Sequence, residues 1–185
     1  MPTSTIVIIA VAVAAAAALI GLLTLGALSA GEKGPRRFSL SPPVDTARFI
    51  DIDAAWAATV EFEVRRSVDV VWQQMLDGPI VALGPVINGP TTVGVTRTYH
   101  GIIAATADVV DQSARSSVTT VGSAISIPVV VKSFAERLAV APVNESSSRV
   151  TYTLAVQPRF IGFLPLRWTA VFARPVIKFV MKMAF

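Results

Sequence analysis

An uncharged apolar run at the start of the chain is the feature that most limits how this protein can fold. No Asp, Glu, Lys or Arg occurs from Thr5 to Ala30, and a helix needs about 20 apolar residues to cross a bilayer. The run therefore predicts a single transmembrane helix at residues 1–30. A cleaved secretory signal is the alternative, since residues 27–30 are small enough for a cleavage site. A signal peptide, however, starts with basic residues and has a shorter apolar stretch.

Charges beside this run predict its orientation. Lys33, Arg36 and Arg37 follow the run with only Glu32 against them, and no charge precedes it. Because basic flanks stay on the cytoplasmic side, we expect a single-pass protein of the cell membrane whose C-terminal domain is cytoplasmic. The run is rich in alanine, which lets another helix approach closely. It therefore suits either a plain anchor or a helix packed against partner transmembrane helices.

Composition excludes several kinds of site. The chain has no cysteine and a single histidine, His100, so it cannot form a disulfide framework, a thiol nucleophile or a zinc finger. Asp51 and Asp53 lie close together, but no series of calcium ligands follows them. The net charge is only +4, and aromatic residues are not interleaved with basic ones as in many nucleic-acid-binding surfaces. We expect no metal, no cofactor and no nucleic-acid partner.

The rest of the chain divides into a linker at residues 31–57, which is rich in proline, and one domain at residues 58–185. The domain opens with a strand, because apolar and charged residues alternate over residues 60–65. A helix then follows Ser67, a favourable N-cap residue. Its apolar residues recur at helical spacing: Val68, Val71, Trp72 and Met75.

Further strands and a final helix complete the pattern. Segments rich in β-branched residues predict successive antiparallel strands at 96–100, 102–110, 118–121, 134–140 and 150–156. A polar stretch at 142–148 joins the last two as a hairpin. Residues 164–185 resume helical spacing, with Pro175 expected to kink the helix. One face carries Trp168, Phe172, Val176, Phe179, Val180 and Met183, and Arg167, Arg174, Lys178 and Lys182 fall near the other.

This order of elements resembles the SRPBCC superfamily, the START-like helix-grip proteins that include the polyketide cyclase/dehydrase group and the Bet v 1 allergens. The resemblance covers residues 58–185 and is carried by the strand-to-helix stretch 60–72 and the final hairpin 136–156. It implies an α+β helix-grip fold, in which a curved antiparallel sheet wraps around a long C-terminal helix. It also implies an apolar cavity, which in relatives holds lipids, sterols or polyketides.

The residues suggest which side chains face such a cavity. Glu136 shares strand parity with Phe134 and Leu138, so we expect it to point inward and its pKa to rise. Arg97 and Tyr99 share one face of their strand, with His100 on the other. The predicted ligand-binding residues are Trp72, Tyr99, Phe134, Glu136, Tyr152 and Phe172.

A basic surface is also expected. Residues 149–185 contain basic side chains and no acidic one, which suits contact with an anionic leaflet. We expect Arg167, Arg174, Lys178 and Lys182 to contact membrane lipid or a partner.

Two functions fit these features. The first is a membrane-anchored cytoplasmic domain that binds a hydrophobic ligand, a lipid or isoprenoid, in a helix-grip cavity. The second is a non-catalytic accessory subunit of a larger membrane complex, such as a respiratory or transport complex. Candidates for proton transfer are few, so we expect no catalytic residue. An enzymatic reading would require turnover to be lost in Glu136→Gln or Tyr99→Phe.

Overall fold

The structure is a computed structural model of the chain. It describes residues 38–77, 92–99, 105–126, 131–164 and 166–185. The transmembrane helix predicted at residues 1–30 lies outside these ranges, as does His100. No helix within the described ranges is long and apolar enough to cross a membrane.

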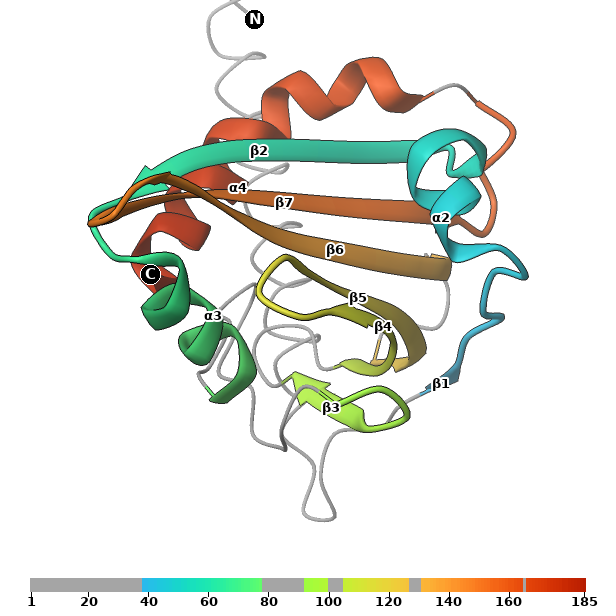
Figure 1. Cartoon of the computed structure of the whole chain (residues 1–185). Coiled ribbons are helices and arrows are strands. Elements are labelled where there is room, and N and C mark those ends of the chain that lie inside the picture. The colour runs from blue at the N-terminus through green and yellow to red at the C-terminus, as the bar shows by residue number, and fades with distance from the viewer. Residues whose placement is uncertain (1–37, 78–91, 100–104, 127–130, 165) are drawn as a thin grey trace, which may run out of the picture.

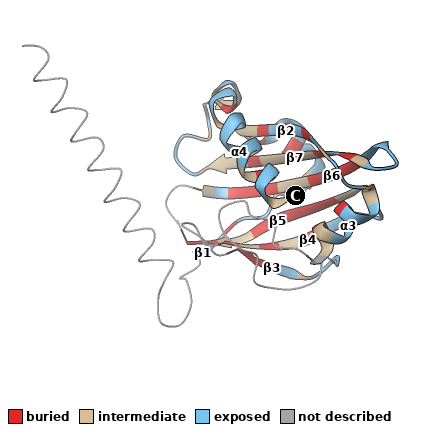
Figure 2. Ribbon diagram, turned by 90° about the vertical axis from the view of Figure 1, so that its left-hand side faces the viewer, coloured by how far each residue is buried: buried red, intermediate tan, exposed pale blue. Residues whose placement is uncertain are grey.

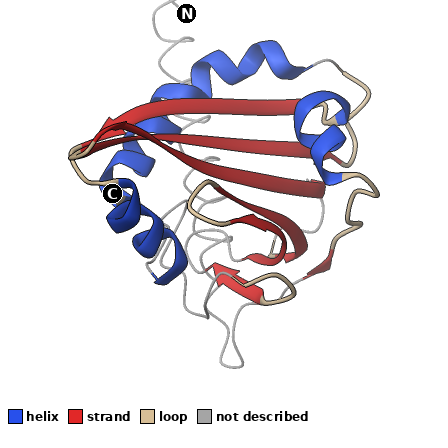
Figure 3. Cartoon of the chain, viewed as in Figure 1, coloured by secondary structure: helices blue, strands red, loops and turns tan. Residues whose placement is uncertain are grey.

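Strands make up most of the described chain, and helices flank them (Figure 3). The elements run in the order β1 (Phe38–Ser39), α2 (Thr46–Arg48), the π-helical turn η1 (Phe49–Asp53), β2 (Trp56–Val64), α3 (Val68–Asp77), β3 (Thr96–Tyr99), β4 (Ala105–Ser113), β5 (Ser117–Ile125), β6 (Val131–Asn144), β7 (Ser147–Pro158), the 3₁₀ turn η2 (Leu166–Thr169) and α4 (Ala170–Ala184).

The strands of the described residues form one curved antiparallel sheet of seven strands (Figure 1). Its order is β2-β7-β6-β5-β4-β3, and β1 pairs with β5. The register between β4 and β5 shifts after Thr106 and after Val109, and such bulges bend a sheet. The turn between β6 and β7 is tighter than the predicted loop at 142–148, because the two strands pair as far as Asn144 and Ser147.

Helices α3 and α4 cover the same face of this sheet and meet near the C-terminus (Figure 1). Val71 and Met75 of α3 share one apolar core with Met181 of α4 and with inward residues of β2, β6 and β7. Gln74 of α3 donates a hydrogen bond to the carbonyl of Ala184 in α4. A curved antiparallel sheet with a C-terminal helix across one face is the predicted α+β helix-grip arrangement.

Residues 38–57, which the sequence places in a linker, pack against the sheet. β1 extends the edge of β5, and Leu40 is buried beside it. Phe49 and Ile50 of η1 are buried against Ala135 and other residues of the opposite face of the sheet. The prolines and polar residues of this segment hide these few apolar anchors from a composition argument.

Candidate functional site

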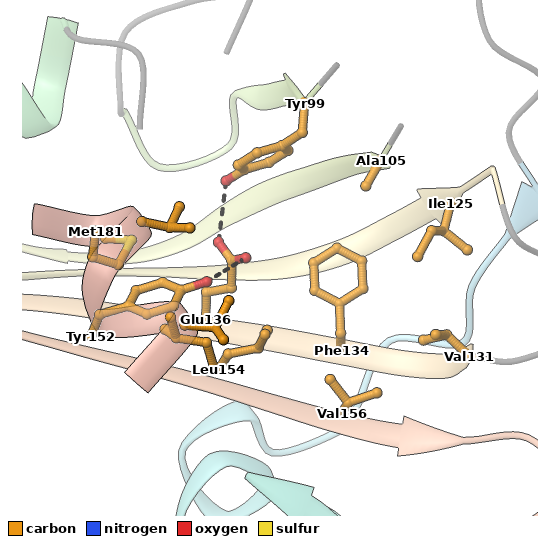
Figure 4. Close-up of a pocket in the computed structure, with 13 residues that line it drawn as sticks. Tyr99, Ala105, Ile125, Val131, Phe134, Glu136, Tyr152, Leu154, Val156 and Met181 are labelled. Carbon is orange, nitrogen blue, oxygen red and sulfur yellow. Dashed lines mark hydrogen bonds between the residues drawn. The ribbon is translucent and has the colours of Figure 1, made fainter. Parts of the chain in front are cut away.

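A cavity of about 280 Å³ lies between the sheet and α4 (Figure 4). Its sheet side is formed by residues of β3, β4, β5, β6 and β7, and its other side by one face of α4. The apolar lining residues are Ala105, Ile125, Val131, Phe134, Leu154, Val156, Val176, Ile177, Val180 and Met181. Three polar side chains join them, those of Tyr99, Glu136 and Tyr152.

The three polar side chains gather at the end of the cavity near Met181 (Figure 4). The Tyr152 hydroxyl donates a hydrogen bond to Glu136 Oε1 at 2.9 Å. The Tyr99 hydroxyl lies 3.4 Å from Glu136 Oε2, a longer and weaker contact in the same direction. Both oxygens of one carboxyl group therefore face tyrosine hydroxyls, while the opposite end of the cavity is apolar.

Strand parity explains how these groups converge. Phe134, Glu136 and Leu138 alternate along β6 and project from the same face of the sheet, as predicted. In the antiparallel pair of β6 and β7, Leu138 lies opposite Tyr152. Tyr152 is thus a diagonal neighbour of Glu136, and a long aromatic side chain can span that separation.

Burial controls the protonation of this cluster. It raises the pKa of Glu136, and this effect outweighs the hydrogen bond from Tyr152 and the charge of Arg97, which both lower it. Burial also raises the pKa of Tyr99 and of Tyr152, and the nearby Glu136 carboxylate raises both further. The two hydroxyls therefore stay protonated and remain donors. A carboxyl with a raised pKa can take up or release a proton closer to neutral pH than an ordinary one.

Arg97 lies two residues before Tyr99 on β3, so the two side chains project from the same face of that strand. Only 1% of its surface is exposed, and its Nε has no hydrogen-bond partner within the described ranges. It is not one of the residues that line the cavity. Its positive charge favours the ionised forms of Glu136 and Tyr99 and so lowers the pKa of both groups.

Gly122 of β5 makes room for the ring of Phe134, which forms part of the cavity wall. A Cβ atom at position 122 would lie 2.2 Å from Phe134 Cε1, much closer than atoms can pack. The ring therefore occupies the space that a side chain at position 122 would need. Sequence reasoning did not identify Gly122, because the need for a glycine arises only from the pairing of β5 with β6.

Four of the six residues predicted to face the cavity line it: Tyr99, Phe134, Glu136 and Tyr152. The structure corrects the placement of the other two. Trp72 is buried in the core between α3 and the sheet and does not line the cavity. Phe172 is 74% exposed, because α4 turns a different side of the helix toward the sheet.

The four basic residues predicted to contact membrane lipid or a partner fall into two groups in the structure. Arg174, Lys178 and Lys182 are exposed on α4. Arg167 is not available as a surface contact, because its guanidinium group donates to the carbonyls of Ala54 at 3.0 Å, Asp51 at 2.9 Å and Ile50 at 3.3 Å. Its role in this structure is to satisfy the carbonyls at the end of η1.

Sequence reasoning missed most of the apolar lining. Leu154 and Val156 follow Tyr152 at strand spacing, so their parity was a usable signal. The α4 residues carried no such signal, since their spacing leaves open which side of the helix faces the sheet. Among the described residues, no group of three or more His, Asp or Glu side chains is placed to hold a metal ion.

No protein-family model matches the sequence, and no curated protein matches it either. Solved structures do match the fold. A major latex-like protein from Panax ginseng has a TM-score of 0.52 and 13% identity over 69% of this chain and 93% of its own. A protein from Mycobacterium smegmatis has a TM-score of 0.51 and 14% identity over 80% and 92%. A protein from Bacillus thuringiensis has a TM-score of 0.51 and 14% identity over 69% and 94%.

These three structures resemble this chain in fold. The shared feature is the helix-grip fold, and the low identity limits the comparison to that fold. The predicted resemblance of the domain is therefore supported at the level of architecture. What the cavity binds has to be argued from its own side chains.

Proposed function

We propose that this protein binds a hydrophobic small molecule, a lipid or isoprenoid, in the cavity between the sheet and α4. The observation that carries the proposal is the cavity itself, which has an apolar wall and one polar end. Ligand sites are commonly concave and apolar with a few placed polar groups. A volume of about 280 Å³ is near the lower limit of such sites, which suits a short isoprenoid or a small ring system.

The polar end favours a ligand that carries a hydroxyl group. Tyr99 and Tyr152 direct their hydrogens toward Glu136, so the lone pairs of the two phenol oxygens remain for a ligand. A hydroxyl can donate to one of these oxygens. A ligand carboxylate would instead lie beside the buried carboxyl of Glu136, and each of the two groups disfavours ionisation of the other.

We further propose that the protein acts at the cell membrane, with the domain on the cytoplasmic side. The support for this is the uncharged run from Thr5 to Ala30 and the basic residues that follow it. A domain held beside the bilayer has a local supply of apolar ligand.

Native mass spectrometry of the full chain, extracted from its membrane in a mild detergent, tests the proposal. We expect one lipid-sized adduct per chain. The emptied protein is then titrated with farnesol and with farnesoic acid, which share a chain and differ at the polar end. We expect saturable binding of the alcohol at one site and binding of the acid at least tenfold weaker near neutral pH.

Blocking variants show whether binding takes place in the cavity. Ala105→Trp fills the cavity from β4, and Leu154→Phe fills it more mildly from β7. The matched control is Val44→Trp, which adds the same ring at a fully exposed position. Loss of binding in both blocking variants, with the control unaffected, supports the proposal. Unchanged binding in a folded Ala105→Trp protein contradicts it.

A further inference from the structure

η2 and the outward side of α4 together carry an apolar stripe that no described residue covers. Trp168 is 69% exposed, Phe172 is 74% exposed and Phe179 is 65% exposed. Val176 and Met183 continue the stripe and are exposed to a similar extent. Large apolar side chains rarely gather on a surface that faces only water.

The stripe follows from the rotation of α4 about its axis. Ala170 and Met181 are buried, and Ile177 packs partly against the core. The large exposed side chains lie on the opposite side of the helix and point away from the sheet: Trp168, Phe172 and Phe179. Figure 2 shows this outer side of α4 as exposed. The helix is therefore apolar on two sides, and the sheet accounts for only one of them.

Basic residues accompany the stripe. Arg174, Lys178 and Lys182 are exposed on the same helix, and no acidic residue occurs after Glu145. An exposed helix with aromatic residues on one side and lysine and arginine beside them matches the composition of interfacial helices, whose apolar side enters the bilayer while the cations meet anionic headgroups.

The segment before the helix extends the same chemistry. Phe160 is 66% exposed and Phe163 is 81% exposed in the connection between β7 and η2. Arg159 is exposed beside them. Bulky aromatic side chains are favoured at the boundary between headgroups and acyl chains.

We infer that α4 and the connection before it form a docking surface for an anionic lipid bilayer. Charge complementarity selects this occupant, because the surface carries basic and no acidic side chains. The short segment between the predicted membrane span and β1 agrees with this occupant. If residues 1–30 span the membrane as the sequence predicts, residues 31–37 reach at most about 25 Å before β1. The inference does not depend on what the cavity binds. Val176, however, belongs both to the stripe and to the cavity lining, so docking would bring the cavity edge to the bilayer.

Tryptophan quenching by brominated lipid tests the inference directly. Residues 1–37 contain no tryptophan, and the chain has three, Trp56, Trp72 and Trp168, so quenching reports on the domain alone. The full chain is placed in nanodiscs of phosphatidylcholine with or without brominated phosphatidylglycerol. Because Trp168 is the most exposed of the three, we expect about one third of the emission to be lost. The loss should shrink in 0.5 M NaCl, which screens exposed charges.

Substitutions on and away from α4 test which residues form the docking surface. Trp168→Phe should abolish the quenching, and the pair Phe172→Asp with Phe179→Asp should reduce it severalfold. The matched control pair is Val44→Asp with Val93→Asp, which places the same charges on exposed apolar positions outside η1, η2 and α4 and should keep the quenching. Lys178→Glu with Lys182→Glu changes no packed residue and should weaken it.

Three results would overturn the inference. The first is an absence of quenching in every disc. The second is quenching of equal strength in zwitterionic brominated lipid, which would remove the role of charge. The third is protection of Trp168 from a water-soluble quencher by a second protein or a second copy of the chain, without quenching by lipid.

Discussion

The chemistry of the cavity depends on a single carboxyl group. Glu136 holds two tyrosine hydroxyls at the end of an apolar space. Burial disfavours its charged form, so the polar end is neutral over a wider pH range than an exposed glutamate would be. This residue should therefore determine both the stability of the domain at different pH values and the polarity of the ligand.

The effect of Glu136 on stability has a definite sign. Its pKa is raised in the folded protein above the ordinary value of 4.5. The folded state then keeps a proton that the unfolded state has released, so stability is lost as pH rises from that ordinary value through the folded pKa. Each pH unit of this interval is worth about 1.4 kcal/mol. Glu136→Gln, which imitates the protonated form, should become progressively more stable relative to the wild type as pH rises above that ordinary value.

Thermal unfolding of the full chain in detergent, at a series of pH values, measures this difference. Other carboxylates change both proteins alike, so the difference between variant and wild type isolates Glu136. The matched control is Glu63→Gln on the exposed side of β2, which makes the same substitution at a side chain outside the cavity. A difference that stays flat with pH would contradict the buried position of Glu136.

Tyr152 should contribute more than Tyr99 to the stability of the domain. The Tyr152 hydroxyl lies 2.9 Å from Glu136 Oε1, whereas the Tyr99 hydroxyl lies 3.4 Å from Oε2. Tyr152→Phe should destabilise the domain by about 1–3 kcal/mol, because it leaves a buried carboxyl oxygen without its donor. Tyr99→Phe should cost less. Chemical denaturation of both variants at one pH compares them, and a larger loss in Tyr99→Phe would contradict the geometry.

At the scale of elements, one side chain links the C-terminal helix to the segment before the sheet. Arg167 of η2 donates to carbonyls of residues 50, 51 and 54. These carbonyls belong to η1 and to the residue that follows it. The start of α4 is thereby attached to η1, which packs on the opposite face of the sheet.

Removing these hydrogen bonds should destabilise both η1 and the start of α4. Arg167→Ala should lower the free energy of unfolding by about 1.5–3 kcal/mol, the range for hydrogen bonds from charged groups. Arg167→Lys should keep only part of this free energy, because an ammonium group cannot reproduce the planar set of donors. Arg174→Ala, on the exposed side of α4, is the control. Hydrogen exchange should show faster opening of η1 in Arg167→Ala alone. Equal stability of the alanine variant and the wild type would disprove the link.

The pairing of β5 with β6 makes a second element-scale prediction. Gly122→Ala places a methyl group where the Phe134 ring lies. The ring must turn into the cavity, and overpacking of this kind costs about 1–3 kcal/mol. Farnesol binding should weaken in parallel. The double variant Gly122→Ala with Phe134→Leu should recover part of both losses. If Gly122→Ala alone binds and unfolds like the wild type, the ring does not form that wall.

At the scale of the whole molecule, α4 separates two apolar environments. One side of the helix closes the cavity with Ile177, Val180 and Met181, and the other carries the exposed stripe. A ligand that binds only the folded state stabilises it in proportion to the logarithm of its concentration, by about 2.7 kcal/mol at 100 times its dissociation constant. Farnesol should therefore raise the unfolding midpoint of the full chain. The variant Phe172→Asp with Phe179→Asp should keep that shift, because neither side chain lines the cavity. Loss of the shift in Phe172→Asp with Phe179→Asp would show that the two sides of α4 do not act separately.

Periodicity in the sequence was sufficient for the main strands and helices of residues 58–185 and for their order, but not for β1, α2 and η1 before them. The alternation around Phe62 and Phe134 and the helical spacing from Val68 to Met75 lead to β2, β6 and α3 as found. The same alternation placed Glu136 on the inward face beside Phe134. These results depend on local geometry, since a period of two or of about 3.6 residues determines which side chains share a face.

Only the tertiary structure decided which of two apolar faces is buried and which residues meet across long separations in sequence. The spacing of apolar residues in α4 is compatible with either Phe172 or Met181 facing the sheet. The small residue Ala170 lets the helix approach the sheet on the side that buries Met181. Arg167 and the carbonyl of Ala54 are more than a hundred residues apart, and Gly122 needs to be glycine only because Phe134 lies across it. Such contacts depend on the pairing of whole elements, which a local period does not specify.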